Sequence, residues 1–139
     1  MLLPTQYKVS EKEMWVVKIN KGNGNKRTLG NEKEAVAAQY LSEIGYRILT
    51  RNFYTRTGEI DLVAQEDGYL VFIEVKYRKN CGSGYPEEAV TPAKQRTIIQ
   101  TARYYMLTNG YPETMPCRFD VVAITGKKIR LIKNAFGVA

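Results

Sequence analysis

Two strand-like runs joined by the dipeptide Asp67-Gly68 constrain the fold more than any other part of this sequence. Residues 59–66 and 69–77 are rich in apolar and β-branched residues. An Asp-Gly pair between two such runs is a strong signal for a hairpin with a two-residue turn. A turn of this length fixes the register of the two strands, so we expect Glu66 to pair with Tyr69.

This register places four charged side chains on one face of the predicted hairpin. Asp61 would lie opposite Glu74, and Glu59 opposite Lys76, because side chains alternate between the faces with a period of two. The other face is predicted to join the core and consists of Ile60, Leu62, Val71, Ile73 and Val75. Two opposed carboxylates repel each other and destabilise a sheet, so they require compensation.

A divalent cation would remove this repulsion. Mg²⁺ is a hard ion that takes oxygen ligands and is often held by one or two carboxylates together with substrate phosphate. Lys76 follows Glu74 by two residues, so its ammonium group would reach the same site and stabilise phosphate charge or position a water molecule. The alternative is an ordinary surface sheet, in which Glu59 pairs with Lys76 and Asp61 accepts a hydrogen bond from a turn or from Arg56.

Helical patterns flank the hairpin on both sides. Apolar residues recur at helical spacing from Asn31 to Ile44, and Thr91-Pro92 predicts the start of a second helix that ends near Asn109. Further strands are expected at residues 46–54, 117–125 and 128–136. The resulting order of helix, three strands, helix and two strands predicts a mixed α/β sheet with helices packed on it.

The 139 residues suffice for one domain, and charge is distributed unevenly along them. Residues 1–30 contain six basic and two acidic groups, whereas residues 31–139 contain fifteen and twelve. We interpret residues 1–27 as a partly flexible extension and residues 28–139 as the folded domain. The net charge of +7 favours a polyanionic partner, but much of the excess lies in the extension.

Several classes of protein are disfavoured by what the sequence lacks. No apolar run approaches the roughly 20 residues of a membrane span, and the first residues lack the apolar region of a signal peptide. Cys81 and Cys117 are far apart in the sequence and are interpreted as free thiols, which predicts a cytoplasmic protein without a membrane partner. Because the chain contains no histidine, carboxylates are the expected ligands of any metal.

The motifs of this chain resemble those of a known family. The matching segments are GEIDLVA (58–64), VFIEVKYR (71–78), EAV (88–90) and CRFDVVAI (117–124). They are similar to the YraN family of small bacterial endonuclease-like proteins, which is part of the PD-(D/E)XK nuclease superfamily with archaeal Holliday junction resolvases and restriction endonucleases. The resemblance covers residues from 30 to about 136 and implies a restriction-endonuclease-like fold in the order α-β-β-β-α-β-β.

The resemblance implies a nuclease that uses Mg²⁺ or Mn²⁺ and hydrolyses DNA rather than RNA, including branched or structured DNA. Asp61 and Glu74 would bind the metal, and the backbone carbonyl of Val75 would add a ligand. Glu34 matches a glutamate of the first helix that often completes such a site. Its alternative role is local, in a capping box with Asn31 as the N-cap.

Other roles follow from the same resemblance. Lys76 would position the water and stabilise charge, and Gln95 would orient catalytic groups from the second helix. The resemblance adds Lys94 as a phosphate contact, whereas Arg56, Tyr77, Arg78 and Lys79 are expected to contact nucleic acid because they lie at the edge of the proposed site. A solvated helix face is the alternative for Gln95 and Lys94. Since resolvase-like members act as dimers, a homodimer is expected.

This chain departs from its superfamily at one motif, and a second function stays open. The first superfamily motif is often Pro-Asp, whereas this chain has Ile60-Asp61, which retains the carboxylate. Asp120 is interpreted as a structural acid on a strand, close to Arg118. A binding module of the same fold, which holds nucleic acid without cleaving it, is the alternative to a nuclease.

Overall fold

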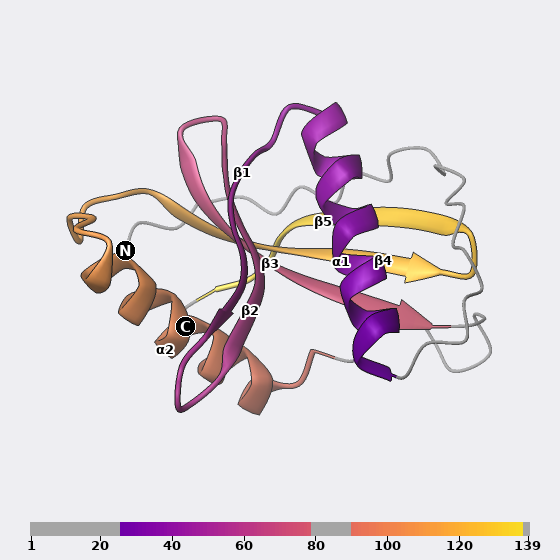
Figure 1. The fold of residues 1–139 in the computed structure, drawn as a ribbon. Coiled ribbons are helices and arrows are strands. Elements are labelled where there is room, and N and C mark those ends of the chain that lie inside the picture. The colour runs from indigo at the N-terminus through magenta and orange to yellow at the C-terminus, as the bar shows by residue number, and fades with distance from the viewer. Residues whose placement is uncertain (1–25, 79–89, 138–139) are drawn as a thin grey trace.

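The computed structural model describes residues 26–78 and 90–137 (Figure 1). Its helices and strands are α1 (Lys26–Glu43), β1 (Arg47–Tyr54), β2 (Glu59–Glu66), β3 (Tyr69–Arg78), α2 (Pro92–Thr108), β4 (Cys117–Thr125) and β5 (Lys128–Phe136). The predictions for the extension, for Lys79 and for Cys81 lie outside the described residues. Neither described helix is long and apolar enough to cross a membrane.

The five strands form one mixed sheet in the order β1-β2-β3-β4-β5. The first three strands are an antiparallel meander, and β5 is antiparallel to β4. β3 and β4 are parallel, and α2 lies in the crossover between them, as parallel neighbours require. The predicted mixed α/β sheet is therefore confirmed, whereas a closer likeness to restriction endonucleases stays a prediction.

The two helices cover opposite faces of this sheet (Figure 1). On one face, Leu62 packs in a buried cluster with Leu41 of α1. On the other face, the neighbouring Val63 packs in a cluster with Phe72 and with Tyr105 of α2. Because consecutive residues of a strand alternate between faces, a central strand buried on both sides reads as a continuous apolar run.

Helix α2 begins where its capping sequence predicts. The Thr91 hydroxyl accepts a hydrogen bond from the backbone N–H of Lys94 at 3.2 Å, and Pro92 occupies the first helical position. Asn109 is the C-cap, and Gly110 follows with a φ of 73°, in the left-handed region that glycine adopts at little cost. The cap therefore fixes the backbone of Lys94, which matters for the site below.

Helix α1 begins earlier than predicted. It starts at Lys26, so Asn31 lies inside the helix and is not its N-cap. The alternative role of Glu34 in a capping box is therefore wrong, because that role requires Asn31 at the first turn.

The β2–β3 hairpin keeps the predicted register only near its turn. The ladder runs from the turn as far as the pair Leu62–Ile73 and then ends. Two predicted pairs are therefore absent, Asp61 with Glu74 and Glu59 with Lys76. Beyond this point the strands separate, which opens the sheet where the charged side chains lie.

The ladder is interrupted at Asp61. In β1, Asn52 has a φ of 55°, which asparagine tolerates better than most residues, and the β1–β2 ladder omits the Asn52–Asp61 pair. Alternation fails at the same place, because Ile60 packs in the α2-side cluster and Leu62 in the α1-side cluster. The prediction that these two residues share a face is wrong. The Asp61 carboxylate turns toward β3 and accepts the backbone N–H of Val75 at 2.8 Å.

Candidate active site

The opening between β2 and β3 brings together polar groups from both faces of the sheet. Glu34 reaches it from α1, which covers one face. Glu74 and Lys76 alternate with the apolar residues of β3, and Lys94 reaches Glu74 from the first turn of α2. Asp61 lies between these groups, since its side chain contacts both Glu34 and Glu74. The predicted convergence therefore occurs through the opened ladder rather than across it.

The three carboxyl groups form a row with Asp61 in the middle. Asp61 and Glu74 are buried, with 7% and 5% of their surface exposed. Burial raises the pKa of Asp61 to about 6, and the charge of Glu34 adds to this effect. Burial also raises the pKa of Glu74 to about 7, with a further contribution from Asp61. The pKa of Glu34 is raised as well, mainly by burial. A hydrogen bond between two carboxyl groups requires a proton on one of them, which agrees with the raised pKa values of this row.

The ammonium groups of two lysines lie near one oxygen of Glu74. The Nζ atom of Lys76 lies 3.4 Å from Oε1, and the Nζ atom of Lys94 lies 3.7 Å from the same atom. Both ammonium groups lower the pKa of Glu74, but burial and the neighbouring Asp61 outweigh them. The two cations are partly exposed, so both remain accessible to an anion that approaches the site.

The donors of this site fit a hard divalent cation. Oε2 of Glu34 is buried without a hydrogen-bond partner, and a buried lone pair of this kind is costly unless something binds it. Repulsion within the row of carboxylates is the energy that a cation would remove. In the described ranges, however, no three acidic or cysteine side chains are arranged as a set of metal ligands. Only adjacent carboxyl groups of the row contact each other.

The other residues predicted from the resemblance do not gather at this row. Gln95 donates its side-chain amide to the carbonyl of Val90 at 3.0 Å, which ties it to the start of α2. Arg56 is exposed in the β1–β2 turn, and Arg78 is exposed at the end of β3. Tyr77 is half-buried, and the ammonium of Lys33 covers one face of its ring. The functional roles of these residues stay predictions.

One residue of the site was missed by the sequence analysis. Asn52 contacts the carboxylate of Glu34 and lowers its pKa. An asparagine in the middle of a strand sequence is unusual, because asparagine is depleted from strands. That position, in the segment TRNFY, was the available signal.

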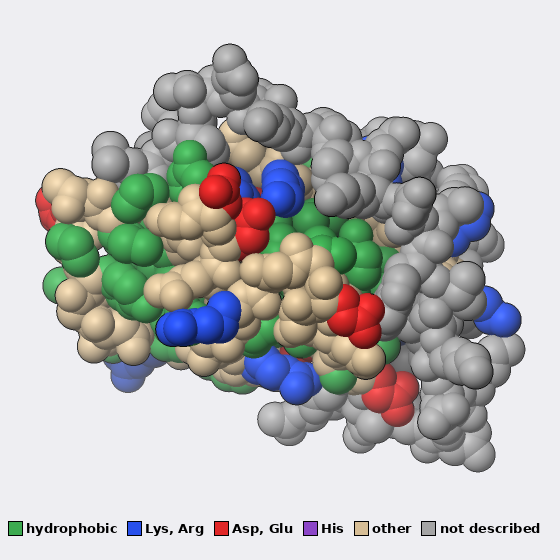
Figure 2. Space-filling view, turned by 90° about the horizontal axis from the view of Figure 1, so that it is seen from above, with side chains coloured by type: hydrophobic (Ala, Val, Ile, Leu, Met, Phe, Trp, Pro, Cys, Tyr) green, Lys and Arg blue, Asp and Glu red, His purple; other side chains and the backbone are tan. Residues whose placement is uncertain are grey.

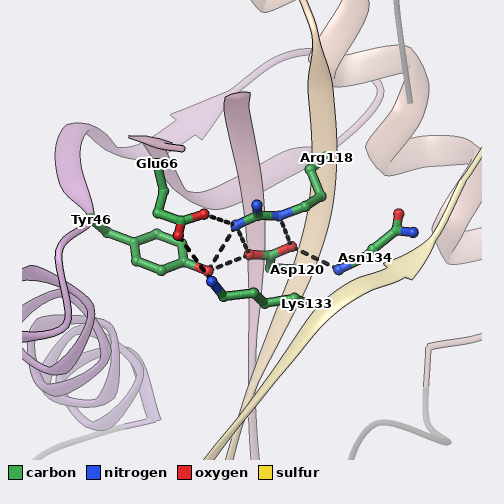
Figure 3. Close-up of polar contacts among 6 residues, drawn as sticks. All are labelled: Tyr46, Glu66, Arg118, Asp120, Lys133 and Asn134. Carbon is green, nitrogen blue, oxygen red and sulfur yellow. Dashed lines mark hydrogen bonds and ion pairs between the residues drawn. The ribbon is translucent and has the colours of Figure 1, made fainter. Parts of the chain in front are cut away.

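A second buried polar cluster, called here the arginine network, lies at the opposite end of β2 (Figure 3). Its members are Tyr46, Glu66, Arg118, Asp120, Lys133 and Asn134. Arg118 donates from Nε and Nη2 to Asp120, both at 2.9 Å, and pairs with Glu66 at 2.7 Å. Tyr46 donates to Asp120 at 2.7 Å, and Lys133 pairs with Glu66 at 2.9 Å. The predicted proximity of Asp120 and Arg118 is confirmed.

Net charge does not by itself locate a surface for nucleic acid. On the face shown in Figure 2, the described acidic and basic side chains are interspersed with hydrophobic ones and do not form a continuous basic patch. A polyanion would therefore have to be recognised by particular residues at particular places, and the lysines beside Glu74 are one such place.

Comparison with known proteins identifies the family. A family profile described as "Uncharacterised protein family UPF0102" matches residues 33–124. A UPF0102 protein of Lachnoclostridium phytofermentans is 62% identical over 112 residues, which cover 81% of this chain and 95% of the relative. UPF0102 proteins of Vibrio parahaemolyticus and Symbiobacterium thermophilum are 46% and 49% identical, with coverage of 80% and 79% of this chain and 93% and 97% of the relatives. The chain therefore belongs to the UPF0102 family, the YraN-like family of bacterial proteins that its motifs resemble.

Proposed function

We propose that this protein is a nuclease that depends on Mg²⁺ or Mn²⁺ and hydrolyses phosphodiester bonds in DNA, including branched or structured DNA. The observation that carries the proposal is the contact of two lysines with one carboxylate oxygen of Glu74, beside the buried carboxyl groups of Asp61 and Glu34. Closely spaced acids with raised pKa values are typical of functional sites, because stability alone does not favour them.

The roles of the side chains follow from their positions. Glu34, Asp61 and Glu74 would hold the cation, which supplies a polarised phosphoryl group and an activated water molecule when it is bound. Lys76 would then exchange its contact with Glu74 for a phosphate oxygen and stabilise charge that develops during hydrolysis. Lys94, whose backbone is fixed by the cap of α2, would provide a second cation for the phosphate.

The raised pKa values also support a role for the cation. Near pH 6 the row of carboxyl groups retains protons, and cation binding would release them because metal ligands must be deprotonated. We therefore expect cation affinity and turnover to rise as the pH increases through the range from about 6 to about 7 in which Asp61 and Glu74 titrate.

The decisive test is cleavage of a labelled panel that contains linear duplex, single-stranded, flap and four-way-junction DNA. Wild type, Lys76→Ala and the exposed control Lys128→Ala would be compared in Mg²⁺, Mn²⁺ and EDTA. We expect metal-dependent cleavage that Lys76→Ala lowers by about 10²-fold or more, the usual effect of removing one group that stabilises the transition state. Cleavage in EDTA, or equal rates in wild type and Lys76→Ala, would refute the assigned site.

A binding module of the same fold is the second candidate. It is favoured by the absence of a ready-made metal-ligand set in the described ranges and by the ion pairs that occupy both lysines. In that case the panel would be bound with structure preference but not cut under any metal condition. Lys76→Ala and Lys94→Ala would then weaken binding to a similar extent.

A further inference from the structure

A basic groove runs along the solvent side of α2, away from the candidate active site. It encloses about 560 Å³ and is lined by Gln95, Arg96, Ile99, Gln100, Arg103 and Gly137. Gly58 abuts a different flank of the same helix, where an added Cβ would meet the side chains of Thr97 and Thr101. Helix α2 therefore separates the groove from the strand that carries Asp61.

The lining of this groove is positively charged, because it contains two arginines. Arg96 and Arg103 are exposed, and neither forms a hydrogen bond or an ion pair with another residue of the described chain. No acidic residue lines the groove, and Ile99 adds an apolar side chain to its lining. Guanidinium groups beside an apolar side chain suit a ligand with phosphates on one side and sugars on the other.

Helix stability does not account for this pattern. The positive end of a helix dipole favours acidic residues in the first turn, but α2 has none there and contains no acidic residue at all. Its basic residues are Lys94 in the first turn, Arg96 in the second and Arg103 farther along. These charges add to the positive potential of the helix end, so a bound polyanion would relieve a repulsion that the free protein retains.

We propose that this groove binds the phosphodiester backbone of a nucleic-acid strand other than the one at the active site. The proposal rests on the proposed function, because it takes nucleic acid as the substrate. Arg96 and Arg103 are seven residues apart, which corresponds to about 10 Å along the helix, so the two guanidinium groups would contact different phosphates of one strand. A ligand that occupies both the groove and the active site must pass across α2, whose diameter with side chains is about 10–12 Å.

This geometry selects for a substrate class. A single strand shorter than the path around α2 reaches only one of the two places, whereas a duplex or a branched molecule offers a second strand. The groove would therefore add affinity for substrates with two strands, and would do so through counterion release rather than through base contacts.

The test is equilibrium binding of labelled DNA in EDTA, where the metal is removed and cleavage cannot consume the probe. Wild type, Arg96→Gln/Arg103→Gln and the control Arg47→Gln would be titrated with a duplex, a four-way junction and a short single strand at several salt concentrations. Arg47 is an exposed arginine at the start of β1, so the control removes a similar charge from another surface. Glutamine preserves helix propensity, and far-UV circular dichroism would verify the fold of each variant.

We expect the double variant to bind duplex and junction roughly tenfold more weakly and to lower the slope of log affinity against log salt by about 2, since each phosphate contact contributes about 0.9. The effect on the short strand should be smaller, and Arg47→Gln should behave as wild type. If the double variant binds the duplex as wild type does while wild type still cleaves DNA, the groove inference fails and the proposed function stands. If wild type neither binds nor cleaves any probe, both fail. Equal competition by polyglutamate would also overturn the inference, because the groove would then accept any acidic polymer.

Discussion

The two ends of β2 lie beside acids in contrasting surroundings: the half-buried Glu66 at one end, and the buried Asp61 with its β3 neighbour Glu74 at the other. In the arginine network, Glu66 contacts both Arg118 and Lys133, and these cations lower its pKa although burial alone would raise it. In the candidate active site, Glu74 also has two cations nearby, yet its pKa is raised to about 7. The number of cations is therefore not what distinguishes the two clusters.

The difference lies in geometry. The ion pairs of Glu66 are 2.7 and 2.9 Å long, whereas those of Glu74 are 3.4 and 3.7 Å long and address a single oxygen. In addition, Glu74 has the buried acid Asp61 as a neighbour. One cluster satisfies its charges within the protein, and the other leaves charge and lone pairs for a ligand. That contrast is the physical basis for assigning stability to the first cluster and function to the second.

The largest expected effect on stability comes from breaking the arginine network. Arg118→Leu removes the partner of Asp120, which is fully buried, and of Glu66. Because these carboxylates would be left in the interior with fewer donors, we expect the free energy of unfolding to fall by about 3–5 kcal/mol. Urea denaturation monitored by circular dichroism measures this change. A loss below about 1 kcal/mol would mean that the network does not stabilise the fold.

The next prediction concerns the pH dependence of stability, which arises from the carboxyl groups of the candidate active site. Since the folded pKa values of Asp61 and Glu74 lie above their ordinary values, the folded protein binds more protons than the unfolded chain between about pH 4 and pH 7. Its stability should therefore fall as the pH rises through this window, by about 2–3 kcal/mol from Asp61 alone. Urea midpoints at a series of pH values without divalent cations test this. A stability that rises steadily with pH across the window would contradict the raised pKa values.

Replacing Asp61 tests whether its charge causes this pH dependence or whether its carboxylate stabilises the fold. Asp61→Asn removes the central charge of the row, so we expect stability at pH 8 to increase by about 1–2 kcal/mol and the pH dependence to flatten. The same variant should abolish any rise in melting temperature caused by Mn²⁺ at pH 8. Glu113→Gln, an exposed acid after α2, is the matched control and should leave both the pH dependence and the Mn²⁺ response unchanged. If Asp61→Asn is destabilising at pH 8, the carboxylate serves the fold through its bond to Val75.

Local signals in the sequence predicted most of the fold. The Thr91 cap, the Asp67-Gly68 turn and the two closing strands each depend on neighbouring residues, and all appear in the structure. The early start of α1 was missed because the segment from Lys26 to Gly30 offers no apolar period and ends in a glycine. Local rules have no access to such a start, which depends on the rest of the fold.

The site was predicted less completely, because its geometry depends on contacts between distant residues. The register of an ideal hairpin gave the right partners for Asp61 but the wrong arrangement, since the β2–β3 ladder ends at the pair Leu62–Ile73 and the β1–β2 ladder omits Asn52 and Asp61. In the arginine network, Tyr46 bonds to residues 72 and 74 positions away, and only the Arg118–Asp120 proximity was visible locally. Sequence motifs thus named the chemical groups, whereas tertiary packing determined which of them are satisfied.

The smallest expected effect is also the sharpest comparison, because it uses two lysines of similar exposure. Lys133 and Lys76 are 28% and 26% exposed, and each pairs with a largely buried glutamate. Lys133→Met should cost about 1 kcal/mol, since Glu66 loses a hydrogen bond at 2.9 Å and has a lowered pKa that opposes protonation. Lys76→Met should change stability by less than about 0.5 kcal/mol at pH 7, because Glu74 can take up a proton at that pH.

Paired urea denaturation and cleavage assays would decide between the two assignments. If the contrast is correct, Lys133→Met loses stability and keeps cleavage, while Lys76→Met keeps stability and loses cleavage. The reverse pattern would exchange the roles of the two ends of β2. Equal losses of stability would imply that both lysines serve the fold, and the longer distances around Glu74 would then have no functional meaning. A difference of about 1 kcal/mol in the free energy of unfolding of these two variants thus tests whether the length of its ion pairs, and not only the presence of cations, distinguishes a structural acid from a functional one.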